Sequence, residues 1–156
     1  MGARRWAWGR WWRCSSSAAS GSCASRSCVA RRPGASAQAW SEEAVAAALA
    51  AGQPVFIDFT ADWCLTCKFN ERTVLQREDV RAAFAQHKVA FFVADWTRRD
   101  AAISAKLAEF GRAGVPMYLL VSPSAPGKPE VLSELLTADS LIDSVRRAAG
   151  RVADAT

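Results

Sequence analysis

Two cysteines separated by two residues, Cys64 and Cys67, are the side chains whose type and spacing best suit covalent chemistry. They follow a strand-like run and open a predicted helix, where free backbone N–H groups and the helix dipole favour a thiolate. Both sulfurs then lie on the same side of the first helical turn and can close a disulfide. We expect the preceding loop, Ala61–Trp63, to leave the Cys64 sulfur exposed and the Cys67 sulfur covered. A cysteine pair in this setting is typical of a redox motif.

Half of a zinc site is the alternative interpretation of the pair, and it requires two further ligands. Residues 41–156 contain no other cysteine and a single histidine, His87, at the end of a predicted polar helix, where we interpret it as solvated. The N-terminal cysteines, Cys14, Cys23 and Cys28, have no metal-ligand spacing, and we assign them no role. The sequence therefore favours redox chemistry, with no metal and no cofactor beyond the disulfide of the pair.

Two carboxylates fall near the cysteines. Asp58 lies inside a strand that is otherwise apolar on both faces, where a charge must be paired or neutralised. Glu71 lies seven residues after Cys64, within about 20° of the same helix face, although a solvated surface charge is the alternative. Both acids would raise the pKa of Cys64, whereas Lys68 and the helix dipole would lower it. Asp58 would also accept a proton from Cys67 as a general base. With no histidine between the cysteines to stabilise a thiolate, the sequence predicts a reductant.

These side chains must be positioned by a regular alternation of strands and helices that begins at residue 41. The 156 residues suffice for one ordinary domain. Ser41 and Asp100 are predicted N-caps, and Gly52 and Gly111 are predicted to end the helices that follow them. Strands are predicted at 55–60, 89–95, 117–121 and, as an edge strand, 130–135, with helices at 42–51, 64–76, 79–86, 100–111 and 137–150. This order predicts one α/β domain over residues 41–150.

Residues 1–40 differ from the rest in charge. They contain seven Arg and no acidic residue, whereas residues 41–156 contain 13 basic and 15 acidic residues, so the net charge of +5 belongs to the N-terminal stretch. A basic groove for nucleic acid on the folded domain is therefore not expected. No apolar run approaches the roughly 20 residues of a membrane-spanning helix, so the sequence predicts no such helix.

The same forty residues show neither a strand nor a helix period and are predicted to be a disordered tail. A basic start and Ala35–Ala37 resemble parts of an export signal, but no apolar segment lies between them. The mixture of Arg and Trp also suits a membrane surface. A misassigned start, so that this stretch is not part of the natural protein, is the remaining interpretation.

The residues around the cysteine pair resemble the thioredoxin superfamily. The stretch Val55–Glu71, VFIDFTADWCLTCKFNE, is most similar to the C-terminal periplasmic domain of the thiol:disulfide interchange protein DsbD and its relatives. The similarity continues through Ala94–Thr97 and Gly114–Leu120 and covers roughly residues 40–150. The Trp-Cys-x-x-Cys-Lys core alone indicates the superfamily. The DsbD branch is indicated by Thr60-Ala61-Asp62, Asn70-Glu71 and Ala94-Asp95-Trp96.

This resemblance implies a thioredoxin-like fold with a central mixed four-stranded sheet flanked by helices. It implies that Cys64 is the attacking thiol and Cys67 the resolving thiol. It also matches Asp58 and Glu71 to carboxylates beside the active-site cysteines.

The substrate-facing side is implied to include Pro116, as a cis-proline that faces the cysteines, and Val115, whose backbone lies beside the sulfurs. Trp63 is expected to pack beside the site and shield it. We interpret Trp96 and Tyr118 as core residues without a function.

The implied activity is that of a protein-disulfide reductase that passes electrons from a membrane-embedded or thioredoxin-type dithiol donor to disulfides of periplasmic proteins. The expected partners are protein thiols and disulfides, a membrane-embedded donor and periplasmic thioredoxin-like acceptors. The domain itself is expected to be soluble and monomeric, on the periplasmic side of the bacterial inner membrane, as a lone relative or a fragment of a longer protein. The alternative is a non-catalytic thioredoxin-like binding module whose cysteine pair is only structural, but an intact pair opposite a Val-Pro sequence favours the enzyme.

Overall fold

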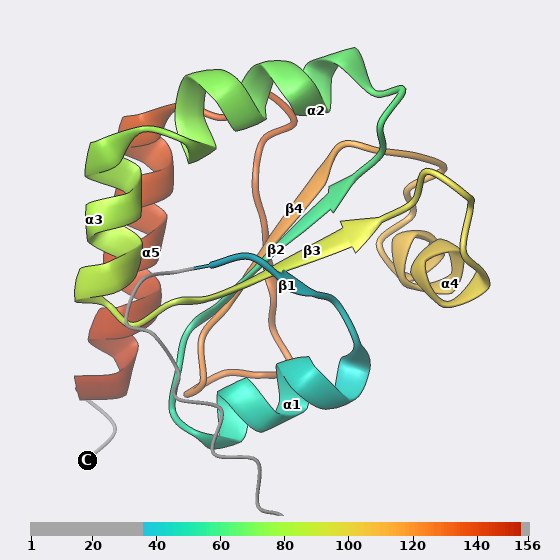
Figure 1. Cartoon of the computed structure of the whole chain (residues 1–156). Coiled ribbons are helices and arrows are strands. Elements are labelled where there is room, and N and C mark those ends of the chain that lie inside the picture. The colour runs from blue at the N-terminus through green and yellow to red at the C-terminus, as the bar shows by residue number, and fades with distance from the viewer. Residues whose placement is uncertain (1–35, 154–156) are drawn as a thin grey trace, which may run out of the picture. The chain divides into compact units, whose positions relative to one another are not determined.

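The buried run Val55–Thr60 forms β2, the central strand of a five-stranded mixed sheet with the order β1-β3-β2-β4-β5 (Figure 1). Strand β3 (Ala90–Asp95) runs parallel to β2, and β4 (Met117–Val121) runs antiparallel to it. The sheet edges are β1 (Gln38–Ala39), parallel to β3, and β5 (Glu130–Val131), antiparallel to β4. The residues that could carry chemistry therefore follow the most central strand of the sheet.

The computed structural model describes residues 36–153. The predicted disorder of residues 1–35, the basic start of an export signal and the three N-terminal cysteines lie outside the described residues. No helix in the described part is long and apolar enough to cross a membrane.

The expected mixed sheet is confirmed, but its expected number of four strands is wrong. The additional strand, β1, lies in the range 1–40 that the sequence assigns to a tail, and it pairs Gln38 with Phe92 and Ala39 with Val93. Two exposed residues carry no periodic apolar signal, so only the partner strand reveals them. Strand β5 is shorter than the expected 130–135, because the chain beyond it turns toward the helix that follows the cysteines.

Helices cover both faces of the sheet (Figure 1). The first face packs against α1 (Glu42–Ala50) and α4 (Ala101–Glu109). The second face packs against η1 (Glu71–Leu75), α3 (Glu78–Gln86) and α5 (Ala138–Ala153), and η1 continues α2 (Leu65–Asn70).

The predicted helix ends are confirmed where local chemistry sets them. The Ser41 hydroxyl accepts a hydrogen bond from the Ala44 N–H (3.1 Å), and the Asp100 carboxylate accepts from the first turn of α4. Gly52 and Gly111 have φ values of +75° and +64°, which glycine adopts without steric cost. These signals need only neighbouring residues, which is why they are legible in the sequence.

Candidate active site

Cys64 is the N-cap residue of α2, directly after the loop that leaves β2. Its sulfur is bonded to that of Cys67, and the two Cα atoms lie 5.3 Å apart. The Cys64 Sγ also accepts a hydrogen bond from the Cys67 backbone N–H (3.2 Å). The predicted position of the pair, at a strand-to-helix junction, is confirmed.

The expected difference in burial between the two cysteines is wrong. Cys64 is 6% exposed and Cys67 is 2% exposed, so both are buried when they form the disulfide. Ala61 lies in the same cluster and Val115 packs against it, which explains the cover over Cys64. A partner must therefore approach the disulfide past the side chains that surround it.

The Val115–Pro116 peptide bond is cis, as the resemblance predicts. Strand β4 begins at the next residue, Met117, so the central part of the sheet fixes this loop. Because Val115 packs against the cysteine cluster, the structure brings this loop and the disulfide together.

The loop before the disulfide is held by residues at the end of β3. The Asp62 N–H donates to Thr97 Oγ1 (2.9 Å), and Trp63 Nε1 donates to the Thr97 carbonyl oxygen (3.4 Å). Thr97 is itself oriented by Asp95, whose Oδ1 accepts from both the backbone N–H and the hydroxyl of Thr97. These hydrogen bonds lower the pKa of Asp95. Sequence reasoning gave Thr97 no role, because its partners lie more than thirty residues away.

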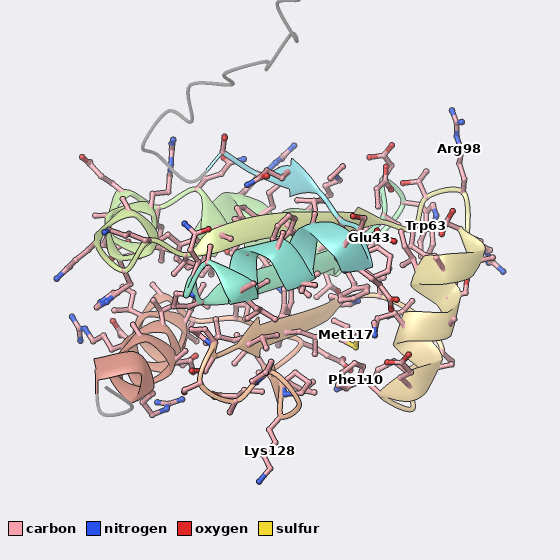
Figure 2. The ribbon with its side chains drawn as sticks, turned by 90° about the horizontal axis from the view of Figure 1, so that it is seen from below. Glu43, Trp63, Arg98, Phe110, Met117 and Lys128 are labelled. Carbon is pink, nitrogen blue, oxygen red and sulfur yellow. A yellow bond between two sulfur atoms is a disulfide. The ribbon has the colours of Figure 1, made fainter. Side chains whose placement is uncertain are left out.

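Trp63 remains 53% exposed, and its ring centroid lies 6.0 Å from that of Trp96. Trp96 is held in turn by a hydrogen bond from Nε1 to Ser104 Oγ (2.8 Å), and the Arg99 guanidinium lies 5.6 Å from its ring centroid. Figure 2 shows Trp63 near α4, with Arg98 extending away from the protein. The contacts of Trp63 anchor it to the β3–α4 loop, and its shielding of the sulfurs stays a prediction.

Asp58 is buried in the middle of β2, where it lies opposite Val93 on one side and Tyr118 on the other. Its Oδ1 atom is buried without a hydrogen-bond partner. Burial, followed by the charge of Glu71, raises the pKa of Asp58 from 3.8 to about 7, although Lys68 acts in the opposite direction. A carboxyl with this pKa exchanges its proton near neutral pH, as a general acid or base requires.

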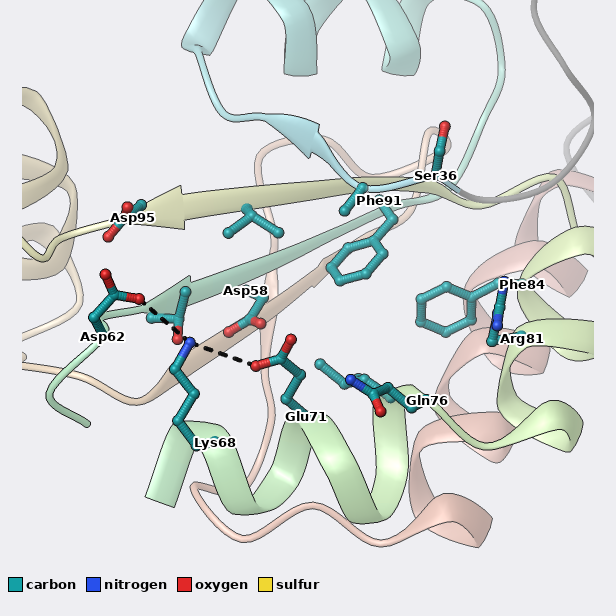
Figure 3. Close-up of a pocket in the computed structure, with 14 residues that line it drawn as sticks. Ser36, Asp58, Asp62, Lys68, Glu71, Gln76, Arg81, Phe84, Phe91 and Asp95 are labelled. Carbon is teal, nitrogen blue, oxygen red and sulfur yellow. Dashed lines mark ion pairs between the residues drawn. The ribbon is translucent and has the colours of Figure 1, made fainter. Parts of the chain in front are cut away.

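Lys68 lies between two other carboxylates of the same region. Its Nζ atom is 3.5 Å from Asp62 Oδ1 and 3.6 Å from Glu71 Oε2 (Figure 3). These three side chains and Asp58 line one pocket between the sheet and the helix that starts after Cys64. The structure thus brings Asp58 and Glu71 together in one pocket. Lys68 forms ion pairs with Asp62 and Glu71.

Asn70 is a buried residue that sequence reasoning used only as part of a resemblance. Its Nδ2 donates to Tyr118 Oη (3.0 Å) and to the Glu134 carbonyl (2.7 Å), and its Oδ1 accepts from the Leu136 N–H (3.3 Å). Glu134 and Leu136, which follow β5, are therefore bonded to α2 and not to the sheet. The hydrogen bonds of Asn70 also fix the end of α2 against β4.

The predicted helix over 64–76 is present but changes type midway. Residues Glu71–Leu75 form a π-helix, in which the Gln76 N–H donates to the Glu71 carbonyl (2.9 Å). Short π-helical segments are frequent at functional sites. Because the first turns are α-helical up to Glu71, the face predicted for this carboxylate is retained.

Within residues 36–153, no group of three or more His, Cys, Asp or Glu side chains is arranged to hold a metal ion. His87 lies at the C-terminal end of α3, apart from the residues that line the pocket of Asp58.

The chain resembles known proteins in sequence. A family model described as thioredoxin-like matches residues 36–123. The thiol:disulfide interchange protein DsbD of Ralstonia nicotianae is 38% identical over 109 residues, which cover 70% of this chain and 18% of that protein. DsbD 1 of Pseudomonas aeruginosa is 34% identical over 112 residues, with the same coverage. The chain therefore spans less than a fifth of the length of these curated relatives.

Solved structures give the same result. The crystal structure of the oxidised C-terminal domain of Neisseria meningitidis DsbD is 28% identical, with a TM-score of 0.57, and the match covers 72% of this chain and 99% of that one. The reduced form of that domain, also 28% identical, has a TM-score of 0.55, with 69% and 96% covered. A thioredoxin from Thermus thermophilus, 19% identical with a TM-score of 0.59 over 78% and 92% of the chains, shows the fold alone. Together with the disulfide at the start of α2, the cis-proline loop and the sheet order, these matches show that the chain belongs to the thioredoxin-like family.

Proposed function

We propose that this chain is a thiol–disulfide oxidoreductase that acts as a protein-disulfide reductase. The observation that carries the proposal is the Cys64–Cys67 disulfide at the N-terminus of α2, packed against Val115 of the cis-proline loop. A pair joined across one helical turn can be opened and closed without rebuilding the fold. The similarity to the DsbD C-terminal domain supports the same chemistry.

The reaction begins with the reduced pair. The Cys64 thiolate attacks one sulfur of a partner's disulfide, forms a mixed disulfide and releases the partner's other sulfur as a thiolate. Cys67 then loses its proton and attacks the Cys64 sulfur, which closes the Cys64–Cys67 disulfide and releases the partner's second thiolate. Two electrons pass from this chain to the partner. A second dithiol must afterwards return two electrons to the pair.

Cys64 is the attacking residue because only its sulfur lies at the N-cap position, where the Cys67 N–H donates to it. Donors of this kind stabilise a thiolate. Asp58 accepts the proton that Cys67 releases, since burial holds its pKa at about 7. Glu71 acts through Asp58, because its charge contributes to that raised pKa.

The direction of electron flow follows from the same charges. A dithiol is a good reductant when its reduced form is not specially stabilised. Lys68 has two carboxylates within 3.6 Å, and their negative charges oppose its stabilising effect on a thiolate. The similarity to DsbD leads us to place the activity on the periplasmic side of the bacterial inner membrane, with a membrane-embedded or thioredoxin-type donor and periplasmic thioredoxin-like acceptors as partners.

Reduction of insulin disulfides by dithiothreitol, with and without the chain, tests the activity. The chain should accelerate the reaction, and no acceleration over the blank would favour a binding module with a structural disulfide. Cys67→Ala should trap mixed disulfides with partner proteins, whereas Cys64→Ala should trap none. Equal trapping by both variants would refute the assignment of roles.

Equilibration of the pair with glutathione tests the direction. The potential should lie near the thioredoxin value of about −270 mV. A potential near the value of about −120 mV found for the oxidant DsbA would contradict a reductase.

A further inference from the structure

The pocket next to Asp58 has the size and lining of a ligand site. Its volume is about 430 Å³, within the range of roughly 300–1,000 Å³ typical of small-molecule sites. It lies between the sheet and the helical segment from α2 to α3 (Figure 3). One end is acidic and the other end is aromatic, so the pocket would suit a molecule with two unlike ends.

An unsatisfied acceptor marks the acidic end. Asp58 is 6% exposed, and its buried Oδ1 has no hydrogen-bond partner. Figure 3 shows its carboxylate directed toward the side chains of Lys68 and Glu71. A buried polar atom without a partner costs about 1–3 kcal/mol, so the Asp58 carboxylate is stabilised by any donor that reaches it.

The charged side chains that line the pocket leave one carboxylate, that of Asp58, without a partner. The pocket is lined by four carboxylates, and Lys68 forms ion pairs with two of them, Asp62 and Glu71. Asp95 accepts its hydrogen bonds from Thr97. Asp58 is the lining carboxylate for which the structure shows no ion pair or hydrogen bond. The other lining cation, Arg81, lies beside Phe84 at the opposite end (Figure 3).

The aromatic end presents a flat apolar wall. The rings of Phe84 and Phe91 lie 5.9 Å apart at an interplanar angle of 87°, and both side chains line the pocket. Phe84 is only 3% exposed, so the half-buried ring of Phe91 forms most of the wall against which a planar group can pack.

We propose that this pocket binds a small organic cation with a flat apolar body, whose amidinium or ammonium group donates to the Asp58 carboxylate. The body packs against Phe91. Nothing in this proposal requires the cysteine chemistry, so the site can be tested in the oxidised chain, in which the disulfide is closed.

Binding of the cation is coupled to the loss of the Asp58 proton. The cation requires an ionised Asp58, and the pKa of Asp58 is about 7 because of burial and the charge of Glu71. Tyr118, which faces Asp58 from β4, has a pKa raised by burial and by Asp58, so it stays neutral near pH 7. From one pH unit below the pKa of Asp58 to one unit above it, affinity should therefore rise about tenfold.

Benzamidine is the probe, and benzamide, its neutral isostere, is the matched control. Titration calorimetry of the oxidised full chain, one pH unit below and one unit above the pKa of Asp58, should show binding of benzamidine. The binding should be tighter at the higher pH. Amide NMR shifts should centre on Thr60, Gln76 and Val93, which line the pocket. N-acetylarginine amide represents an arginine side chain of a docked protein. A stronger response to it than to benzamidine would overturn the assignment to a free small molecule.

Three variants test whether Asp58 anchors the ligand. Asp58→Asn keeps the shape of the side chain and should weaken benzamidine binding at least tenfold and remove its pH dependence. Asp143→Asn makes the same change on exposed α5 and should alter neither. Glu71→Gln should lower the pH at which the affinity rises, because its charge raises the pKa of Asp58. Absent binding, equal binding of benzamide, or undiminished binding by Asp58→Asn would each overturn the proposal.

Discussion

The two faces of β2 contain alternate residues of one strand and differ in chemistry. Toward α1 and α4, the strand presents only apolar side chains, which are Val55, Ile57 and Phe59. Toward α3 and α5, it presents one apolar side chain followed by two polar ones, which are Phe56, Asp58 and Thr60. The first face is filled by packing, and the second opens into the pocket lined by Asp58, Lys68 and Glu71.

This difference teaches that one strand can serve two purposes with alternate residues. The residues on one face stabilise the fold, and those on the other face carry reactive groups. The apolar face fixes the position of β2, because its side chains are almost completely buried among helices. The polar face can then hold a carboxyl group whose burial is unfavourable to the fold. The neighbours Ile57 and Asp58 are the sharpest pair with which to test this separation.

Ile57→Ala should have the largest effect on stability. Truncation of a buried Ile costs about 2–5 kcal/mol, and Ile57 is almost fully buried. Urea unfolding should show this loss at every pH, while the insulin-reduction rate per folded molecule stays unchanged. A large fall in that rate would break the separation between the two faces.

Asp58→Asn should change stability in a pH-dependent manner. The folded pKa of about 7 lies above the ordinary value of 3.8, so the folded state binds this proton more tightly. The resulting stabilisation is complete below about pH 3.8 and is lost as the pH rises to about 7. The loss is on the order of 4 kcal/mol.

Urea unfolding across this pH interval measures the prediction. The wild-type chain should lose stability as the pH rises, and Asp58→Asn should remove most of that slope while it slows insulin reduction. Asp143→Asn, an exposed control, should retain the slope. An unchanged slope in Asp58→Asn would show that another group titrates.

Asn70→Ala should cost about 1–3 kcal/mol, because it leaves buried groups without partners. The groups concerned are the Tyr118 hydroxyl, the Glu134 carbonyl and the Leu136 N–H. Thermal unfolding measures the loss. Thr73→Ala, which removes one exposed hydrogen bond on the same helical segment, is the control and should cost less.

Thr97→Val should have the smallest effect on stability, because the two hydrogen bonds of the Thr97 hydroxyl, from the Asp62 N–H and to Asp95, are exposed to water, and each contributes at most about 0.5–1.5 kcal/mol. Because this hydroxyl accepts from the Asp62 N–H, its loss should also slow insulin reduction severalfold by loosening the loop before Cys64. Thr97→Ser retains the hydroxyl and should restore the rate. An unchanged rate in Thr97→Val together with a low rate in Thr97→Ser would mean that packing by the methyl group matters instead.

Much of the fold could be predicted because its signals are local. The apolar run of β2, the Ser41 and Asp100 caps and the two glycines with positive φ each depend on neighbouring residues. The cysteine pair was located in the same way. Strand β1 could not be predicted, because its two exposed residues become a strand only beside Phe92 and Val93.

The parts of the site that were missed depend on distant partners. Asn70 contacts residues 48 to 66 positions away, and the Asp62–Thr97 bond spans 35 positions. The burial of Cys64 likewise depends on Val115. Asp58, in contrast, was recognisable as one acid in an apolar strand, and the structure adds its unpartnered oxygen and its pocket.

The edges of the sheet have a consequence for the protein in solution. Both edge strands, β1 and β5, are only two residues long, so each exposes few free backbone donors and acceptors. Very short edge strands protect natural sheets against edge-to-edge aggregation. A longer exposed edge would offer unfolded chains a template for strand addition. Because β1 and β5 are so short, we expect the sheet to resist aggregation through its edges.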